Sequence, residues 1–175
     1  LGADHEDIAL TDSTTMGIGV VYHGLRLRPT QEIVTTEHDY YATHAALRLA
    51  AARVTGTRVR KIALYEQPQA ASADDIVARI RRALTPTTRV LALTWVHSST
   101  GLKLPIGPIT EAVASVNAGR DEADQILVCV DGVHGFGVED VSVGDLRCDF
   151  LMAGCHKWLF GPRGTGIIYG RPQAW

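Results

Sequence analysis

The architecture of this chain is best approached from the stretch at residues 125–131, which has the sequence QILVCVD and is followed at once by the glycine-rich segment GVHGFG. Nearly every position from 125 to 130 is apolar, which is typical of a strand buried on both faces inside a parallel sheet. Asp131 ends the run, and a carboxylate at the end of a buried strand is costly unless it meets a cation or several donors. The stretch therefore predicts a buried strand that carries an acidic side chain to the edge of a sheet.

Strands and helices alternate on both sides of this stretch. We expect further strands at residues 7–11, 32–36, 59–65, 89–95, 149–153 and 166–169, and helices at about 13–25, 42–52, 72–84 and 109–117. Ser, Thr and Asp precede two of these helices, where such side chains cap the first turn. The alternation predicts an α/β fold with a largely parallel sheet.

The composition is that of a globular domain. The chain has 175 residues, of which 46% are hydrophobic and 21% charged, with a net charge of −2. The charge balance favours neither nucleic acid nor a membrane surface as a partner, and no apolar run reaches the roughly 18–20 residues of a membrane span. The three cysteines lack zinc-like spacing, and reduced thiols in a cytoplasmic protein are the simplest explanation. Because the chain starts at Leu1 without methionine, we expect it to be part of a longer protein.

Polar side chains follow five of the expected strands at the points where those strands end. Ligands of parallel sheets bind beyond the carboxyl ends of the strands, so we expect these residues to share one edge. They are Ser13, Thr14 and Thr15, then His38, Ser98 and Ser99, Asp131 and His134, and finally His156 and Lys157.

Lys157 lies in the segment GCHKW, directly after a short apolar strand. An exposed lysine on a glycine loop is the simplest interpretation of this residue alone. An imine, however, needs an amine that loses its proton easily, and burial near cationic groups such as His156 and Arg163 lowers a lysine pKa. Asp131 is a suitable partner for a protonated pyridine nitrogen, although a helix cap or an ion pair with arginine is an open alternative. Together the two residues favour a pyridoxal phosphate (PLP) cofactor on Lys157.

Other residues of the set match other parts of such a ligand. A helix that begins after Ser13 offers free N–H groups to an anion, and His156 is a possible phosphate ligand. The ring of His38 can face a flat ligand, and His134 lies three residues after Asp131 on the same loop. Each also has a structural interpretation, as a helix cap, a surface histidine or a core histidine. The histidines lack paired spacing, so we expect no metal site.

This ordered set resembles the class V aminotransferase family of fold-type I PLP enzymes, which includes isopenicillin N epimerase-like proteins and cysteine desulfurases. The resemblance covers almost the whole chain, and the segments TGLKLPI (100–106) and HKWL (156–159) are most similar to the epimerase-like branch. It implies a three-layer α/β/α arrangement in which residues 1–175 form the large PLP-binding domain. An N-terminal segment and a small C-terminal domain would be missing, and the active site would be shared across a homodimer.

The resemblance also implies a role for each matching residue. Lys157 would form the Schiff base, Asp131 would pair with the pyridine nitrogen, and His38 would stack on the ring. His134 would approach the ring hydroxyl, near which many relatives have an asparagine at the position of Ser98. Thr14 and Thr15 would hold the phosphate together with His156. Gly154 replaces the serine or threonine that often precedes the His-Lys pair.

We therefore expect a PLP enzyme acting on an amino acid or amine, in which Lys157 is the general base and the ring delocalises a carbanion. Transamination or epimerisation is the leading interpretation. Oxidative decarboxylation or deamination with oxygen, and C–S lysis, are alternatives on the same fold. The local candidates for residues that influence the substrate and the reaction are Tyr40, His97 and Arg163. A phosphate- or nucleotide-binding module without catalysis is an alternative of another class, although the chain has neither GxGxxG nor GxxxxGK[ST]. A non-catalytic relative kept for dimerisation would need neither Asp131 nor Lys157.

Overall fold

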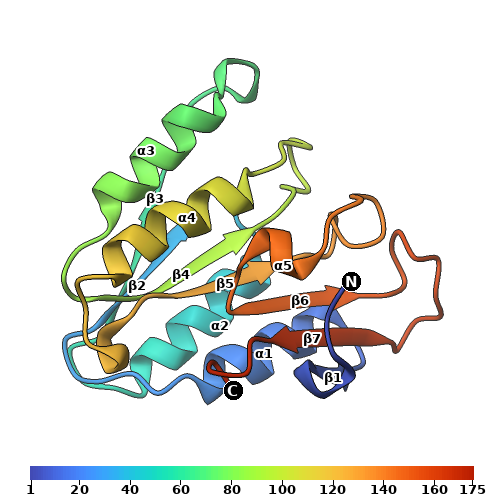
Figure 1. Cartoon of the computed structure of the whole chain (residues 1–175), viewed down its shortest axis with the longest axis horizontal. Coiled ribbons are helices and arrows are strands. Elements are labelled where there is room, and N and C mark those ends of the chain that lie inside the picture. The colour runs from blue at the N-terminus through green and yellow to red at the C-terminus, as the bar shows by residue number, and fades with distance from the viewer.

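A computed structural model describes all 175 residues and contains one seven-stranded sheet (Figure 1). The order across the sheet is β1-β7-β6-β5-β4-β2-β3, so the apolar stretch at residues 125–131 supplies the central strand, β5. The strands are β1 (Ile8–Thr11), β2 (Glu32–Thr36), β3 (Arg58–Ile62), β4 (Thr88–Thr94), β5 (Leu127–Asp131), β6 (Phe150–Gly154) and β7 (Gly166–Gly170).

The sheet is mainly parallel. The neighbours from β3 to β6 pair in parallel, and β7 runs antiparallel both to β6 and to β1. Two antiparallel pairings in succession leave β1 pointing the same way as β6. The carboxyl ends of β1, β2, β4, β5 and β6 therefore lie at one edge of the sheet, as the sequence predicted.

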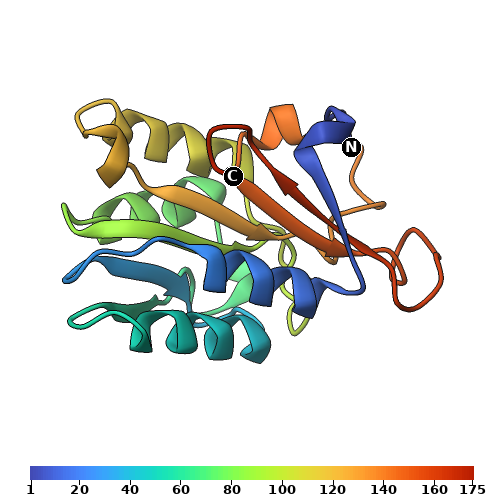
Figure 2. The ribbon, with the colours of Figure 1, turned by 90° about the horizontal axis from the view of Figure 1, so that it is seen from below.

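Helices cover both faces of the sheet (Figures 1 and 2). The cover of one face consists of α1 (Thr14–Gly24) and α2 (Tyr41–Ala52), whose side chains share a core with Ile33, Ala92 and Met152. The cover of the other face consists of α3 (Ala73–Ala83), α4 (Ile106–Asn117) and α5 (Val143–Leu146), which pack over Leu91, Val130 and Leu151. Alternate residues of a strand point to opposite faces, so one strand serves both cores. The predicted three-layer α/β/α fold is confirmed.

Several element boundaries differ from the prediction. Strand β3 ends at Ile62 rather than at residue 65, because its partner β2 ends at Thr36, the residue opposite Ile62. Helix α4 begins at Ile106, since Pro108 is accommodated in a first turn that has no intrahelical N–H partners. Helix α5 was not predicted, because four residues show no helical periodicity; a capping box between Ser142 and Asp145 supports it.

The chain also contains short 3₁₀ turns at His5–Asp7, Pro68–Ala70 and Glu122–Asp124. None of the helices combines the length and the apolar character that a membrane crossing requires. The loop at residues 155–165, between β6 and β7, extends beyond the carboxyl ends of the strands (Figure 2). This loop carries His156 and Lys157.

Candidate active site

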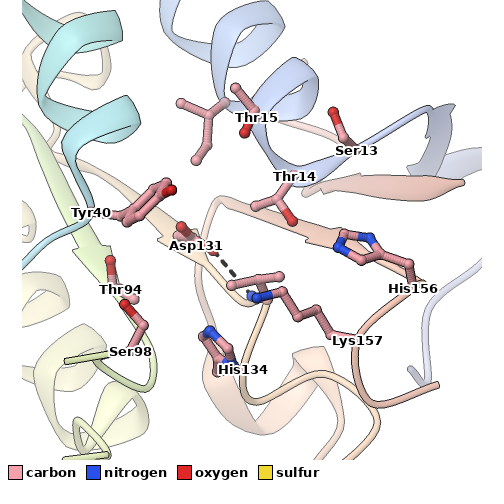
Figure 3. A pocket seen from close by; sticks show the side chains of 12 residues that line it. Ser13, Thr14, Thr15, Tyr40, Thr94, Ser98, Asp131, His134, His156 and Lys157 are labelled. Atoms are coloured by element: carbon pink, nitrogen blue, oxygen red, sulfur yellow. Dashed lines mark hydrogen bonds between the residues drawn. The ribbon is translucent and has the colours of Figure 1, made fainter. Parts of the chain in front are cut away.

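A cavity of about 280 Å³ opens at the carboxyl edge of the sheet (Figure 3). It collects side chains from segments more than 140 residues apart in the sequence. Its wall consists of Ser13, Thr14, Thr15, Ile18, Tyr40, Thr94, Ser98, Asp131, Val133, His134, His156 and Lys157. Of the residues expected to share this edge, all lie on the wall except His38 and Ser99.

Asp131 forms the floor of the cavity at the end of β5, where it is 2% exposed. Its Oδ1 accepts a hydrogen bond of 3.1 Å from the Val133 N–H, drawn dashed in Figure 3. No cation lies within ion-pairing distance of it, so the arginine pair that remained open from the sequence is not formed. The helix cap is not formed either, because the next helix begins only at Val143. Burial, opposed by the Val133 bond and by Lys157 but reinforced by Asp39, raises the pKa of Asp131 to about 7. A cationic ligand would relieve this cost.

The N-terminus of α1 forms one side of the cavity. The hydroxyl of Ser13 is occupied, since it accepts from the Met16 N–H at 3.1 Å and donates to Asp12 at 3.0 Å. Thr14 accepts a bond from the Gly154 N–H but keeps its hydroxyl hydrogen free for a ligand. Thr15 is exposed, and the first turn has no acidic residue, so its unpaired N–H groups suit an anion.

Lys157 and His156 reach the cavity from the loop after β6. The Lys157 side chain extends toward Asp131, and His156 lies beside Thr14 (Figure 3). Lys157, His156 and Arg163 are all exposed, which differs from the buried cationic surroundings expected for the lysine, because the loop projects past the sheet. Arg163 is not part of the cavity wall.

His134 lies next to Lys157 on the wall (Figure 3). Its Nδ1 accepts a hydrogen bond of 3.1 Å from the indole N–H of Trp158, and the two rings meet edge to face. Burial lowers the pKa of His134, and the nearby Lys157 ammonium lowers it further. The ring is therefore neutral at physiological pH.

His38 does not line the cavity. Its ring stacks on Tyr65, with centroids 3.9 Å apart and an interplanar angle of 5°, and its Nε2 is buried without a hydrogen-bond partner. Tyr40, two residues later in the same turn, is the aromatic side chain on the cavity wall. The stacking role of His38 thus stays a prediction.

His38 packs against two buried aromatic side chains, Tyr65 and His97. The Tyr65 hydroxyl lies 2.8 Å from Nδ1 of His97, which is 0% exposed. Burial, partly offset by Asp39, lowers the pKa of His97 to about 4, with a smaller contribution from His38 in the same direction. His97, one of the three residues considered for tuning the reaction, is therefore a neutral core residue next to the cavity.

Thr94 and Asp39 were missed by the sequence analysis. Thr94 ends β4 on the cavity wall, and its buried hydroxyl has no hydrogen-bond partner. Asp39 accepts from the Thr36 N–H at 2.7 Å and from the Thr94 N–H at 2.8 Å, so it ties the end of β2 to the end of β4. The signal for Thr94 was its place at a strand end, which is how Asp131 was found; nothing in the sequence pairs it with Asp39.

The residues fit PLP as a ligand. The buried carboxylate of Asp131 lacks a cation, the hydroxyl of Thr94 lacks a partner, and the N-terminus of α1 is free for a phosphate. Within the chain no group of three or more His, Cys, Asp and Glu side chains is arranged to hold a metal ion.

Comparison with known proteins agrees with this geometry. The family model described as Aminotransferase class-V matches residues 1–175. An isopenicillin N epimerase of Streptomyces clavuligerus is 30% identical over 172 residues, which are 98% of this chain and 40% of the relative. A cysteine desulfurase of Pectobacterium carotovorum subsp. carotovorum (strain PC1) is 29% identical over 172 residues, 97% of this chain and 39% of the relative. The chain thus spans about two fifths of the length of these relatives.

Solved structures share the fold. The cystine C-S lyase C-DES, in complex with its reaction product cysteine persulfide, superimposes with a TM-score of 0.85 at 26% identity, over 98% of this chain and 43% of that one. A K223A mutant of C-DES, with glycine covalently linked to the PLP cofactor, has a TM-score of 0.84 at 25% identity, over 97% and 42%. The cysteine desulfurase CsdA of Escherichia coli has a TM-score of 0.82 at 27% identity, over 98% and 40%. The predicted family, fold type and PLP cofactor are confirmed.

Proposed function

This chain belongs to the class V aminotransferase family, and on that premise we propose that it is the large, cofactor-binding domain of a PLP enzyme that acts on an amino acid or amine. One observation carries the proposal: the Lys157 amine and the buried carboxylate of Asp131, which has no ion-pair partner, line the same cavity. PLP supplies an aldehyde that condenses with an amine and a ring that accepts an electron pair from the substrate α-carbon.

Several residues of the wall have a proposed task in this enzyme. The Lys157 amine holds the cofactor at rest and moves the proton at the substrate α-carbon. The Asp131 carboxylate accepts the N–H of the protonated ring nitrogen and keeps that proton in place. The N–H groups of α1 bind the phosphate with Thr14, Thr15 and His156, on the side of the cavity where α1 begins (Figure 3).

The faces and the hydroxyl of the ring are assigned to aromatic and polar side chains. His134 and Ser98 lie on the wall where the ring oxygen would be bound. Tyr65 covers one face of His38, so the opposite face of that imidazole is the one available to the cofactor. Tyr40, which lies on the wall, is the second candidate for stacking on the cofactor ring. The PLP affinities of the His38→Ala and Tyr40→Ala variants distinguish the two candidates, because the loss of the stacking residue should weaken binding more.

Trapping of the cofactor tests the function directly. Purified full-length protein incubated with PLP should show a visible absorption band that borohydride bleaches, and mass spectrometry should find the reduced adduct on Lys157. The matched control is Lys103→Ala, which removes an exposed lysine that pairs with Glu139 away from the cavity and should leave the adduct unchanged. A protein that gains no band, or an adduct that persists in Lys157→Ala, would overturn the assignment.

We propose aminotransferase- or epimerase-like chemistry first, supported by the epimerase relative. Cleavage of a C–S bond is the second candidate, supported by the cysteine desulfurase relative and by the fold shared with the lyase C-DES. No cysteine lines the cavity, so a sulfur acceptor would have to come from outside this chain. Product analysis with alanine, glutamate, cysteine and cystine, with and without oxygen, distinguishes keto acid, inverted amino acid, sulfide and oxidised product.

The assembly and location of the protein are part of the proposal. Exposed apolar side chains neighbour two residues of the cavity wall in the sequence. Tyr41 follows Tyr40, and Trp158, Leu159 and Phe160 follow Lys157, with Phe160 86% exposed. This supports a homodimer with a shared site, with an N-terminal segment and a small C-terminal domain completing the protein. Three free cysteines support a cytoplasmic location. Light scattering of the full-length protein tests the dimer.

A further inference from the structure

The contact between Trp158 and His134 decides where the proton of this histidine lies. The indole nitrogen of Trp158 is 3.1 Å from Nδ1 of His134. An indole N–H is only a donor, so Nδ1 must be the unprotonated, accepting nitrogen. A neutral imidazole carries a single proton, which the contact therefore places on Nε2.

The Nε2–H group is free for a ligand. Trp158 is the one protein partner of the His134 ring, and the ring lies on the cavity wall between Lys157 and Ser98 (Figure 3). Without Trp158 either ring nitrogen could carry the proton, and one of the two forms would present a lone pair instead of a donor. An oxygen of the ligand that bears negative charge needs the donor.

We propose that Trp158 is a positioning residue, which fixes His134 as the Nε2–H tautomer so that it donates a hydrogen bond to the ring oxygen of PLP. The inference rests on the proposed function, since PLP is the ligand whose oxygen receives this bond. It adds a residue outside the cavity wall to the machinery that holds the cofactor.

The same contact links two loops that carry functional residues. Trp158 directly follows Lys157 on the loop after β6, and His134 lies on the loop after β5. The Trp158 side chain is 45% exposed, so its removal leaves no buried cavity and is compatible with folding. The chain offers a matched control in Trp175, which is 55% exposed and packs against Phe150 far from the site.

The first arm of the test needs no cofactor. Full-length protein stripped of PLP and labelled with ¹⁵N-histidine is studied by long-range ¹H–¹⁵N NMR, with His134→Gln identifying the signals of His134. We expect the Nε2–H form alone in the parent and in Trp158→Phe a measurable Nδ1–H population, while Trp175→Phe matches the parent. If Trp158→Phe keeps the parent tautomer, the inference is wrong, whatever the protein does with PLP.

The second arm measures binding and absorption. Trp158→Phe should raise the Kd for PLP about three- to tenfold, the effect of one hydrogen bond, and shift the visible band of the bound cofactor. In a His134→Gln background the same substitution should change neither, because the residue through which it acts is gone. An equal effect in both backgrounds would show that Trp158 acts by packing and overturn the inference, whereas absence of PLP binding in the parent would overturn the proposed function instead.

Discussion

The Thr14 hydroxyl accepts a hydrogen bond of 2.7 Å from the Gly154 N–H, across 140 positions of sequence. The bond is buried and joins the N-terminus of α1 to the end of β6, three residues before Lys157. A Cβ atom at Gly154 would lie 3.1 Å from this hydroxyl and 3.0 Å from Nδ1 of His156. Glycine at this position therefore lets the first turn of α1 and the loop that carries Lys157 approach each other closely.

Replacing Thr14 by valine should destabilise the protein by about 1–2 kcal/mol, because a buried N–H loses its partner while the volume is conserved. Urea unfolding of the cofactor-free protein measures this, and PLP affinity should fall as the two parts of the site separate. Thr14→Ser keeps the oxygen and serves as the control. Equal stability of the valine and serine variants would show that the bond contributes nothing.

Asp131→Asn should stabilise the cofactor-free protein at pH 8. The folded-state pKa of about 7 lies above the ordinary value of 3.8, so the folded state binds the proton more tightly than the unfolded state. Below pH 4 both states are protonated and the residue costs nothing; above pH 7 the folded protein holds a buried carboxylate at full cost, about 2–4 kcal/mol. Its contribution to stability therefore falls as the pH rises from 4 to 7.

Thermal unfolding between pH 5 and pH 8 checks the prediction for Asp131, and the advantage of the asparagine variant should shrink toward pH 5. The same variant should weaken PLP binding at least about tenfold, since it loses a charged hydrogen bond. Stability and cofactor binding would then change in opposite directions. A variant that is less stable than the parent at pH 8 would contradict the assignment of an unpaired buried carboxylate.

Gly135→Ala should destabilise the protein by about 1–3 kcal/mol through overpacking. The added Cβ would lie 2.2 Å from the ring of Trp95, which is 4% exposed and has no room to move. The displaced loop carries His134, so the Kd for PLP should rise as well. Gly19→Ala is the control, because nothing lies within 4 Å of its Cβ in α1 and alanine should stabilise that helix by about 0.5–1 kcal/mol.

Tyr65→Phe should cost about 1–2 kcal/mol, because it leaves Nδ1 of the fully buried His97 with no hydrogen-bond partner while the stack on His38 is kept. Tyr22→Phe is the matched control: Tyr22 is also fully buried, but its hydroxyl has no partner, so phenylalanine should be neutral or stabilising. In urea unfolding, the two variants should change the free energy of unfolding with opposite signs or by clearly different amounts. Equal shifts would mean that the bond between Tyr65 and His97 is not made.

Much of the site followed from position along the chain. Asp131, Lys157 and Thr14 were found because each lies at the end of a strand or within three residues of it, and the carboxyl ends of parallel strands meet at one edge. Thr94 also ends a strand, but it was passed over because the strand was expected to run on to residue 95, which placed Thr94 inside it. Contacts between side chains of different loops, such as Trp158 with His134, have no signature in the spacing of residues.

Apolar patterning and chain direction are local properties, and from them the sequence predicts the class of fold, the burial of residues 125–131 on both faces and most of the strand ends that form the site. Three features of the site depend on the folded arrangement instead: which aromatic ring lines the cavity, the exposure of Lys157 and the lack of a cation beside Asp131. These depend on how loops from separate strands meet. A buried carboxylate costs free energy only where its neighbours fail to compensate it, and those neighbours are brought together by the fold.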